Sequence, residues 1–150
     1  TFSFIVGVND YHDKEILQLK QGLIMKTILD TLRKRWDEWV TSKTIAKRKF
    51  IAYSTQDWML LAYLDALGCS KAALGGTVPG YNSIVVLELA EHNGQPFVEV
   101  FFKDNSMNEL KDITEAVRGC GSSPCALEKF LNCCDDYMTE DPKTVCGKQS

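Results

Sequence analysis

The residues best suited to chemistry lie between Tyr53 and Asp57, where a short apolar run gives way to polar side chains. Asp57 carries a carboxyl group that can donate or accept a proton, and such groups serve as general acids and bases in enzymes. A helix that starts at this point would use the same carboxylate as an N-cap, and on the residues alone this structural role is the stronger interpretation.

The two histidines are weaker candidates. His12 lies among carboxylates in the stretch Asp10-Tyr11-His12-Asp13 and could be a base or a ligand, but we interpret it as a residue of a surface loop. His92 falls in a predicted hairpin turn, where a polar side chain is expected in any case.

Cysteines are the other reactive groups, and most of them lie near the end of the chain. They are Cys69, Cys120, Cys125, Cys133, Cys134 and Cys146. A structural zinc site typically needs ligand pairs two to four residues apart, whereas Cys120 and Cys125 are five apart and Cys133 and Cys134 are adjacent. We therefore predict no metal site but disulfides, and an oxidising compartment, either secretory or lysosome-like. The pairing stays open, because six thiols permit fifteen full pairings.

A helix, a strand and a second helix are predicted to position Asp57. Apolar residues recur at three- and four-residue spacing from Gly22 to Val40, which predicts an amphipathic helix. Phe50 to Ser54 is a short apolar run that suits a buried parallel strand. Trp58 to Leu67 is apolar on nearly all sides and predicts a buried helix, with Gly68 in the C′ position. In such α/β arrangements ligands bind beyond the carboxyl ends of the strands.

The second half of the chain predicts a hairpin and a short closing helix. The runs Ile84 to Ala90 and Phe97 to Lys103 are rich in valine and phenylalanine, and the Asn-Gly pair between them is a strong hairpin signal. Asp104 to Gly119 is predicted to be a long surface loop with one or two helical turns. Ala126 to Tyr137 is predicted to be a short helix.

Composition and charge exclude several classes of protein. The chain has 150 residues, enough to bury a core, so residues 1–150 are expected to form one domain. The net charge is −3 and the basic residues are scattered, so we expect no nucleic-acid partner. No apolar run approaches the length of a membrane span, so we expect no membrane association. The chain begins without methionine, and we expect it to be processed or cut from a longer protein. We expect no cofactor.

Five blocks of sequence occur in an order that is found in a known family. They are Gln21–Ile24, similar to a Gly-Gly-x-Leu-Leu helix opening; KFIAYSTQD at Lys49–Asp57, similar to KLxxYSAHD; Val78–Ser83, similar to LPPYAS; the hairpin region Ile84–Asn105; and Gly119–Phe130, similar to GCxxxCPLExF. Through these blocks the chain resembles the carboxyl-terminal portion of the histidine acid phosphatases. The resemblance implies part of a three-layer α/β fold of the histidine-phosphatase, phosphoglycerate mutase-like type. That part has a mixed sheet and a carboxyl-terminal β-hairpin.

The resemblance also implies roles for two residues. In the family, the histidine of an Arg-His-Gly-x-Arg-x-Pro motif attacks phosphorus, and a His-Asp pair binds the phosphate and protonates the departing alcohol. Asp57 occupies the proton-donor position, and Gln56 stands where the family has histidine. Glutamine cannot carry positive charge, so a contact worth roughly 1.5–3 kcal/mol is weakened to a neutral one. The Arg-His-Gly motif is absent from these 150 residues.

The resemblance extends to a possible ligand site and to one disulfide. Trp58 and Met59 replace the small hydroxyl residues that usually follow the family's aspartate, and with Tyr53 and Gln56 they could line a vestigial pocket. The family pattern also implies a local disulfide between the first two cysteines of the closing block, Cys120 and Cys125.

We therefore expect a secreted or lysosome-like relative of the histidine acid phosphatases that lacks catalytic activity as this chain, with Asp57 vestigial. Two alternatives stay open. A second chain or an amino-terminal half could complete an acid phosphomonoester hydrolase. The pocket around Tyr53, Gln56 and Trp58 could instead bind a small molecule or a protein.

Overall fold

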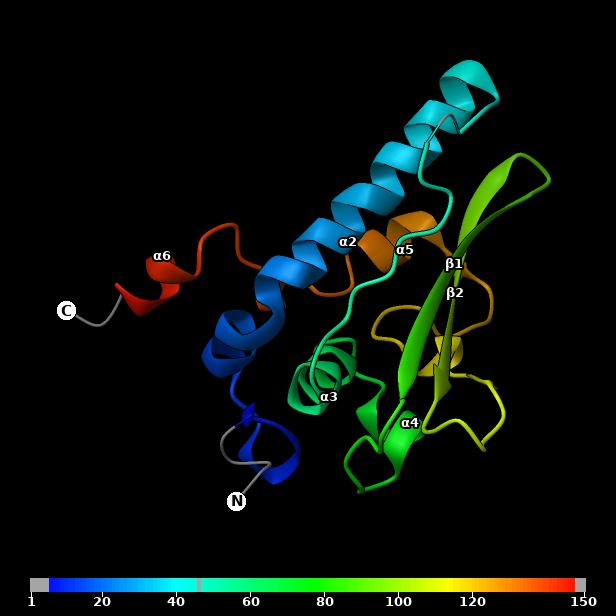
Figure 1. Ribbon diagram of the computed structural model, residues 1–150. Helices are drawn as coiled ribbons and strands as arrows, with labels where there is room; N and C mark the ends of the chain where they lie inside the picture. The colour runs from blue at the N-terminus through cyan, green and yellow to red at the C-terminus, as the bar shows by residue number, and fades with distance from the viewer. Residues whose placement is uncertain (1–5, 46, 148–150) are drawn as a thin grey trace.

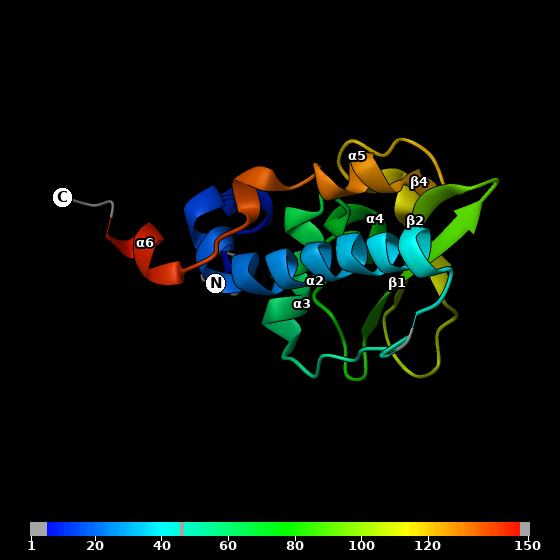
Figure 2. The same cartoon turned by 90° about the horizontal axis from the view of Figure 1, so that it is seen from above.

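One long helix crosses the molecule, with shorter helical elements packed against it and a β-hairpin to one side (Figure 1). The computed structural model describes residues 6–45 and 47–147. The helical elements are η1 (Asn9–Tyr11), α2 (Lys14–Ser42), α3 (Asp57–Ala66), α4 (Ser70–Leu74), η2 (Thr114–Ala116), α5 (Leu127–Leu131), η3 (Asp135–Tyr137) and α6 (Pro142–Cys146). The strands are β1 (Ile84–His92), β2 (Gln95–Lys103), β3 (Lys111–Asp112) and β4 (Cys125–Ala126). In the view from above, α2 lies across the middle of the molecule (Figure 2).

Helix α2 contains the predicted helix and starts earlier than the apolar pattern indicated. Its start is fixed by Asp13, whose Oδ1 accepts hydrogen bonds from the backbone N–H groups of Glu15 at 2.9 Å and Ile16 at 3.1 Å. The predicted apolar face is buried in the middle of the helix, where Met25 is fully enclosed. Val40 near its end is 52% exposed, so the last turns of the helix extend beyond the core.

Gly22 allows α2 to approach the carboxyl-terminal segment closely. A Cβ atom at this position would lie 2.9 Å from the backbone N of Thr139 and 3.0 Å from the carbonyl O of Tyr137. The neighbouring Gln21 is buried, and its Nε2 donates a hydrogen bond of 2.7 Å to the same carbonyl of Tyr137. Backbone therefore packs directly on backbone at this point.

Helix α3 is the predicted second helix, with one correction at its start. Asp57 is the first helical residue and not the N-cap, which is Gln56 and makes no side-chain cap hydrogen bond. The end is as predicted: Gly68 has φ +82°, and its N–H donates to the Asp65 carbonyl. The N–H of Cys69 reaches back to the Leu64 carbonyl at 3.0 Å, which completes a Schellman motif.

The parallel strand predicted at Phe50–Ser54 is not formed. The segment is irregular, and Phe50 is 83% exposed and Tyr53 45% exposed. A parallel strand needs neighbours in a sheet, and every strand pairing in the described part of the chain lies between residues 84 and 126. The apolar run therefore predicted both burial and a strand wrongly, because apolar composition alone does not supply a pairing partner.

The predicted hairpin is confirmed, together with the α/β class. Strands β1 and β2 pair antiparallel, with Leu87 opposite Val100. The two turn residues Asn93 and Gly94 have φ values of 52° and 78°, as a type I′ turn requires. The far edge of β2 carries β3 and β4, both antiparallel, so the sheet over the described residues is antiparallel throughout and not mixed.

The region predicted as a surface loop, residues 104–119, has three buried residues, Ile113, Thr114 and Val117. Asp112 holds this loop to the cysteine-rich segment. Its carboxylate accepts hydrogen bonds from the Thr114 hydroxyl at 2.6 Å and from the Ser123 hydroxyl at 2.6 Å. Burial raises the pKa of Asp112, but the hydrogen bonds from Ser123 and Thr114 outweigh that effect and leave the pKa below its ordinary value.

We predict that Gly22→Ala lowers the free energy of unfolding by about 1–3 kcal/mol, because the added methyl group would force α2 away from Thr139. Helix propensity alone would favour alanine by about 1 kcal/mol, so a net loss isolates the packing effect. Urea unfolding measures the change. The control is Gly76→Ala, since a Cβ at Gly76 meets nothing within 4 Å. Equal unfolding midpoints for the two variants would contradict the close approach.

We also predict that the contribution of Asp112 to stability depends on pH. Because the folded pKa lies below the ordinary value of 3.8, the ionised carboxylate stabilises the folded state above that pH, and the contribution is lost as the pH falls through the folded pKa. The difference in unfolding free energy between wild type and Asp112→Asn should therefore shrink in acid. Denaturant titrations at several pH values test this, with Glu115→Gln as the matched exposed control. A difference that stays constant into acid would refute the prediction.

Candidate functional site

The predicted site residues lie at the start of α3 and in the connection before it. Gln56 and Asp57 are exposed, and Trp58 is half-buried against the core. The polar groups bond to one another: the Trp58 indole N–H donates to Gln56 Oε1, and the Trp58 backbone N–H donates to Asp57 Oδ1 at 2.7 Å. The ammonium group of Lys20 lies 5.1 Å from the centre of the Trp58 ring. The structure thus brings Gln56, Asp57 and Trp58 together, and leaves their carboxylate and amide groups open to solvent.

Two surface hollows lie away from these residues. One, of about 480 Å³, is lined by Arg118, Gly119, Glu128, Lys129, Asn132 and Cys133. The other, of about 350 Å³, is lined by Lys34, Asp37, Glu38, Thr41 and Ser42. Neither hollow includes Tyr53, Gln56 or Trp58, so the ligand pocket expected at those residues corresponds to neither of them.

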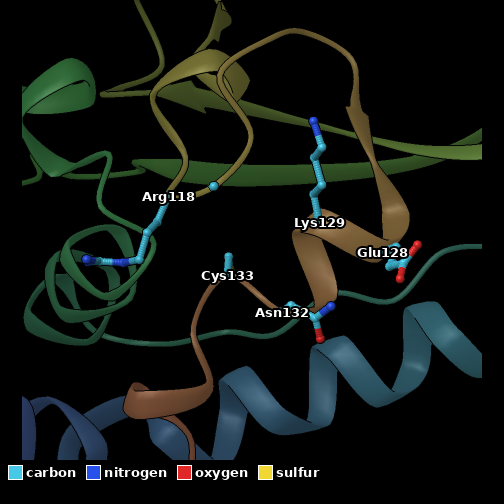
Figure 3. Close-up of a pocket in the computed structure, with 6 residues that line it drawn as sticks. Arg118, Glu128, Lys129, Asn132 and Cys133 are labelled. Atoms are coloured by element: carbon cyan, nitrogen blue, oxygen red, sulfur yellow. The ribbon is translucent and has the colours of Figure 1, made fainter.

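The side chains of the larger hollow do not converge on one point (Figure 3). The guanidinium group of Arg118 turns toward the end of α3, where its Nη2 lies 3.5 Å from the carbonyl O of Ala66. It also lies 4.8 Å from the centre of the Tyr137 ring. Lys129 points in another direction, so the two cations do not jointly hold an anion in this arrangement.

The described residues offer neither a metal site nor a membrane-spanning helix. Among residues 6–45 and 47–147, no group of three or more His, Cys, Asp or Glu side chains is arranged to hold a metal ion. Within the same part of the chain, no helix has both the length and the apolar character needed to cross a membrane.

A hydrogen-bonded chain that the sequence did not reveal runs through His12. Its Nδ1 lies 3.0 Å from Asp65 Oδ2, and its Nε2 lies 2.9 Å from the Tyr137 hydroxyl. Ser70 Oγ donates to the other oxygen of Asp65 at 2.8 Å. The interpretation of His12 as an ordinary loop residue missed these ties. Asp65 is a carboxylate among the apolar residues of the last turns of α3. It was the sequence feature that could have indicated a buried polar partner.

This network holds segments together and does not present a reactive group. The Tyr137 ring is 3% exposed, and it is covered by the Arg118 guanidinium and by the Lys14 ammonium, which lies 5.7 Å from its centre. A substrate therefore has no direct access to the phenol. The same four-residue chain joins the segment before α2, helix α3 and the segment after α5.

The cysteines form two disulfides. Cys120 and Cys125 are joined with an S–S distance of 2.03 Å, the pairing that the family resemblance implied. Cys133 and Cys134, adjacent in the sequence, form the second disulfide. Cys69 is a buried free thiol and Cys146 an exposed one.

Comparison with known proteins gives several relatives, although no family model matches the chain. It is 31% identical over 95% of its length to putative acid phosphatase 1 of Caenorhabditis briggsae, of which it covers 35%. It is 26% identical over 93% of its length to putative acid phosphatase 1 of Caenorhabditis elegans, again covering 35%. It is 29% identical over 91% of its length to prostatic acid phosphatase of Rattus norvegicus, covering 32%. The chain thus spans about a third of the length of the curated relatives it matches.

We predict that His12→Ala lowers the free energy of unfolding by about 1–3 kcal/mol, because Asp65 Oδ2 and the Tyr137 hydroxyl lose the hydrogen bonds that His12 makes to them. Thermal or urea unfolding at neutral pH measures the change. His92→Ala is the matched control: His92 lies on the exposed hairpin, and the expected change is within about 0.5 kcal/mol. If both variants unfold at the same midpoint, the His12 network does not stabilise the fold.

Proposed function

We propose, from the relationship of this chain to acid phosphatases over nearly its whole length, that it forms part of an acid phosphatase-like fold and does not by itself hydrolyse phosphomonoesters. Completed by an amino-terminal half or a second chain, the same residues would contribute to an acid phosphomonoester hydrolase. In that assembly Asp57 stands at the proton-donor position and Gln56 beside it.

The observation that carries this proposal is the exposure of the segment that matches the family best. Residues 49–57 lie on the surface, with the aromatic rings of Phe50 and Tyr53 in solvent and the Asp57 carboxylate free of any built cavity. A general acid accelerates phosphate transfer only beside a nucleophile and groups that stabilise the phosphoryl oxygens. Exposed aromatic side chains next to such a carboxylate favour a surface that a further polypeptide segment covers.

The arginines of the chain are engaged elsewhere or stand apart from Asp57. Arg35 donates to Glu38 at 2.7 Å on α2, and Arg118 packs over Tyr137. Arg48 is exposed in the connection before Phe50. Arginine is the side chain that best holds phosphoryl oxygens in a fixed geometry, and among residues 6–45 and 47–147 no arginine forms an ion pair or hydrogen bond with Asp57.

A role in binding is the second candidate, and the exposed apolar side chains favour a protein over a small molecule. Phe50, Ile51 and Tyr53 form an open surface, whereas small-molecule sites are enclosed and bury most of the ligand. The occupant we favour is the missing part of an acid phosphatase-like domain. For the location of the protein, the Cys120–Cys125 disulfide supports a secreted or lysosome-like compartment.

A chimaera tests the proposal. This chain replaces the corresponding third of putative acid phosphatase 1 of Caenorhabditis briggsae, and release of p-nitrophenol from p-nitrophenyl phosphate is measured at acid pH. We expect no turnover by the chain alone and measurable turnover by the folded chimaera. Asp57→Asn in the chimaera should lower kcat by roughly 10²–10⁴-fold, the usual contribution of a general acid. Asp37→Asn, on the exposed side of α2, is the matched control.

Gln56→His in the same chimaera should raise kcat/KM, because a histidinium replaces a neutral contact with a charge-assisted one, a gain of about 1–1.5 kcal/mol, or roughly 5- to 12-fold. Gln95→His at the start of β2 controls for the substitution itself. The proposal fails if the chain alone turns over substrate. It also fails if a folded chimaera responds to neither Asp57→Asn nor Gln56→His.

A further inference from the structure

Two cysteines that are far apart in the sequence meet the same end of α3. Cys69 follows this helix, and its Sγ donates to the carbonyl O of Leu64 at 3.5 Å. The Sγ of Cys134 lies 3.4 Å from the carbonyl O of Ala66. Both sulfur atoms therefore lie against carbonyl groups of the last turn of one helix, and both cysteines are fully buried there.

The third cysteine of this cluster connects it to the larger surface hollow. Cys133 is joined to Cys134 by the disulfide and lines the hollow beside Arg118 and Lys129. Figure 3 shows Cys133 on the segment that follows α5, between Arg118 and Asn132. Cys134 of the disulfide thus lies with Cys69 at the end of α3, and its bonded neighbour Cys133 lines an open hollow.

We propose that Cys69 exchanges with this disulfide, so that Cys69 becomes bonded to Cys134 and Cys133 becomes a free thiol in the hollow. The Cys69 thiol loses its proton to solvent, and its sulfur attacks Sγ of Cys134. The Cys133–Cys134 bond breaks, and its electron pair leaves with Sγ of Cys133, which takes up a proton. One disulfide breaks and one forms, so the step needs no oxidant and no reductant.

The two disulfide pairings close chain loops of different length, and this difference favours the pairing of Cys69 with Cys134. A disulfide stabilises the folded state largely by restricting the unfolded chain, and the effect grows with the length of the loop that it closes. A bond between adjacent residues restricts the unfolded chain hardly at all. A bond between Cys69 and Cys134 closes most of the second half of the chain and ties the end of α3 to the segment before η3.

Burial of the Cys69 thiol makes the exchange slow. Removal of the Cys69 thiol from water raises its pKa to about 12, so the attacking thiolate is scarce at neutral pH while the protein stays closed. The exchange therefore proceeds slowly, through brief openings of the segment around Cys134. Once released, Cys133 lies beside Arg118 and Lys129, and nearby cations make a thiol more reactive toward disulfides and electrophiles.

Peptide mapping tests the exchange. The oxidised protein is incubated at neutral pH, its free thiols are blocked with N-ethylmaleimide in acidic denaturant, and it is digested with trypsin without reduction. Trypsin releases Cys69 in peptide 50–71, and Cys133 with Cys134 in peptide 130–143. We expect the two peptides to become joined during incubation and the maleimide to move from Cys69 to Cys133. If peptide 50–71 stays separate, with Cys69 labelled throughout, the proposal is overturned.

Variants separate this exchange from other thiol chemistry. Cys69→Ser should abolish the joined peptide, since peptide 50–71 has no other cysteine, and Cys133 should then stay unlabelled. Cys146→Ser removes the exposed free thiol and should leave the yield unchanged; a loss of the joined peptide in this variant would overturn the direct attack. Circular dichroism checks that both variants fold. If Cys69→Ser does not fold, Cys133→Ser serves instead: with oxidised glutathione it should form the Cys69–Cys134 bond directly, and failure to do so would also overturn the proposal.

Discussion

The fold depends on one residue, Tyr137, where segments from both ends of the chain meet. Its carbonyl accepts the hydrogen bond from Gln21 and lies against Gly22, and its hydroxyl binds His12. Its ring is covered by Arg118. A buried backbone carbonyl must be paired, and the long helix supplies the donor from a position where a bulkier neighbour than glycine would prevent the approach. The carboxyl-terminal segment, the long helix and the start of the chain are therefore positioned by contacts with a single side chain and its carbonyl.

This arrangement explains why the candidate site lies apart from the best-packed region. The first half of α2, the end of α3 and the segment through Tyr137 form the enclosed core, whereas Asp57 lies at the opposite, solvent-facing end of α3. The helix presents its N-terminus, with Asp57 and the backbone N–H groups of its first turn, to a surface. A carboxylate in the first turn complements the positive end of the helix dipole, which suits a structural role in this chain. It also places the carboxylate where an added segment can reach it.

Local sequence signals predicted the parts of the fold that depend on local contacts. The Asn93-Gly94 pair specified the turn, and the runs rich in valine and phenylalanine on either side specified its strands, because both signals act between residues that are near in sequence. Gly68 marked the end of α3 for the same reason. The segment Phe50–Ser54 was predicted wrongly as a strand, since apolar character indicates a preference for burial but not which strand pairs with it. The contacts of His12 were unpredictable because they require three distant segments at once.

The long separation of the Tyr137 contacts along the chain has a consequence for the order of folding. The hairpin of β1 and β2 joins residues close in sequence, and such hairpins form in roughly microseconds. The bonds from Tyr137 to His12 and Gln21 close loops of nearly the whole chain, so their entropic cost is met only after the intervening elements have become compact. During synthesis, moreover, Tyr137 emerges from the ribosome long after α2. The surface of α2 around Gly22 therefore stays uncovered until Tyr137 and Thr139 have been synthesised.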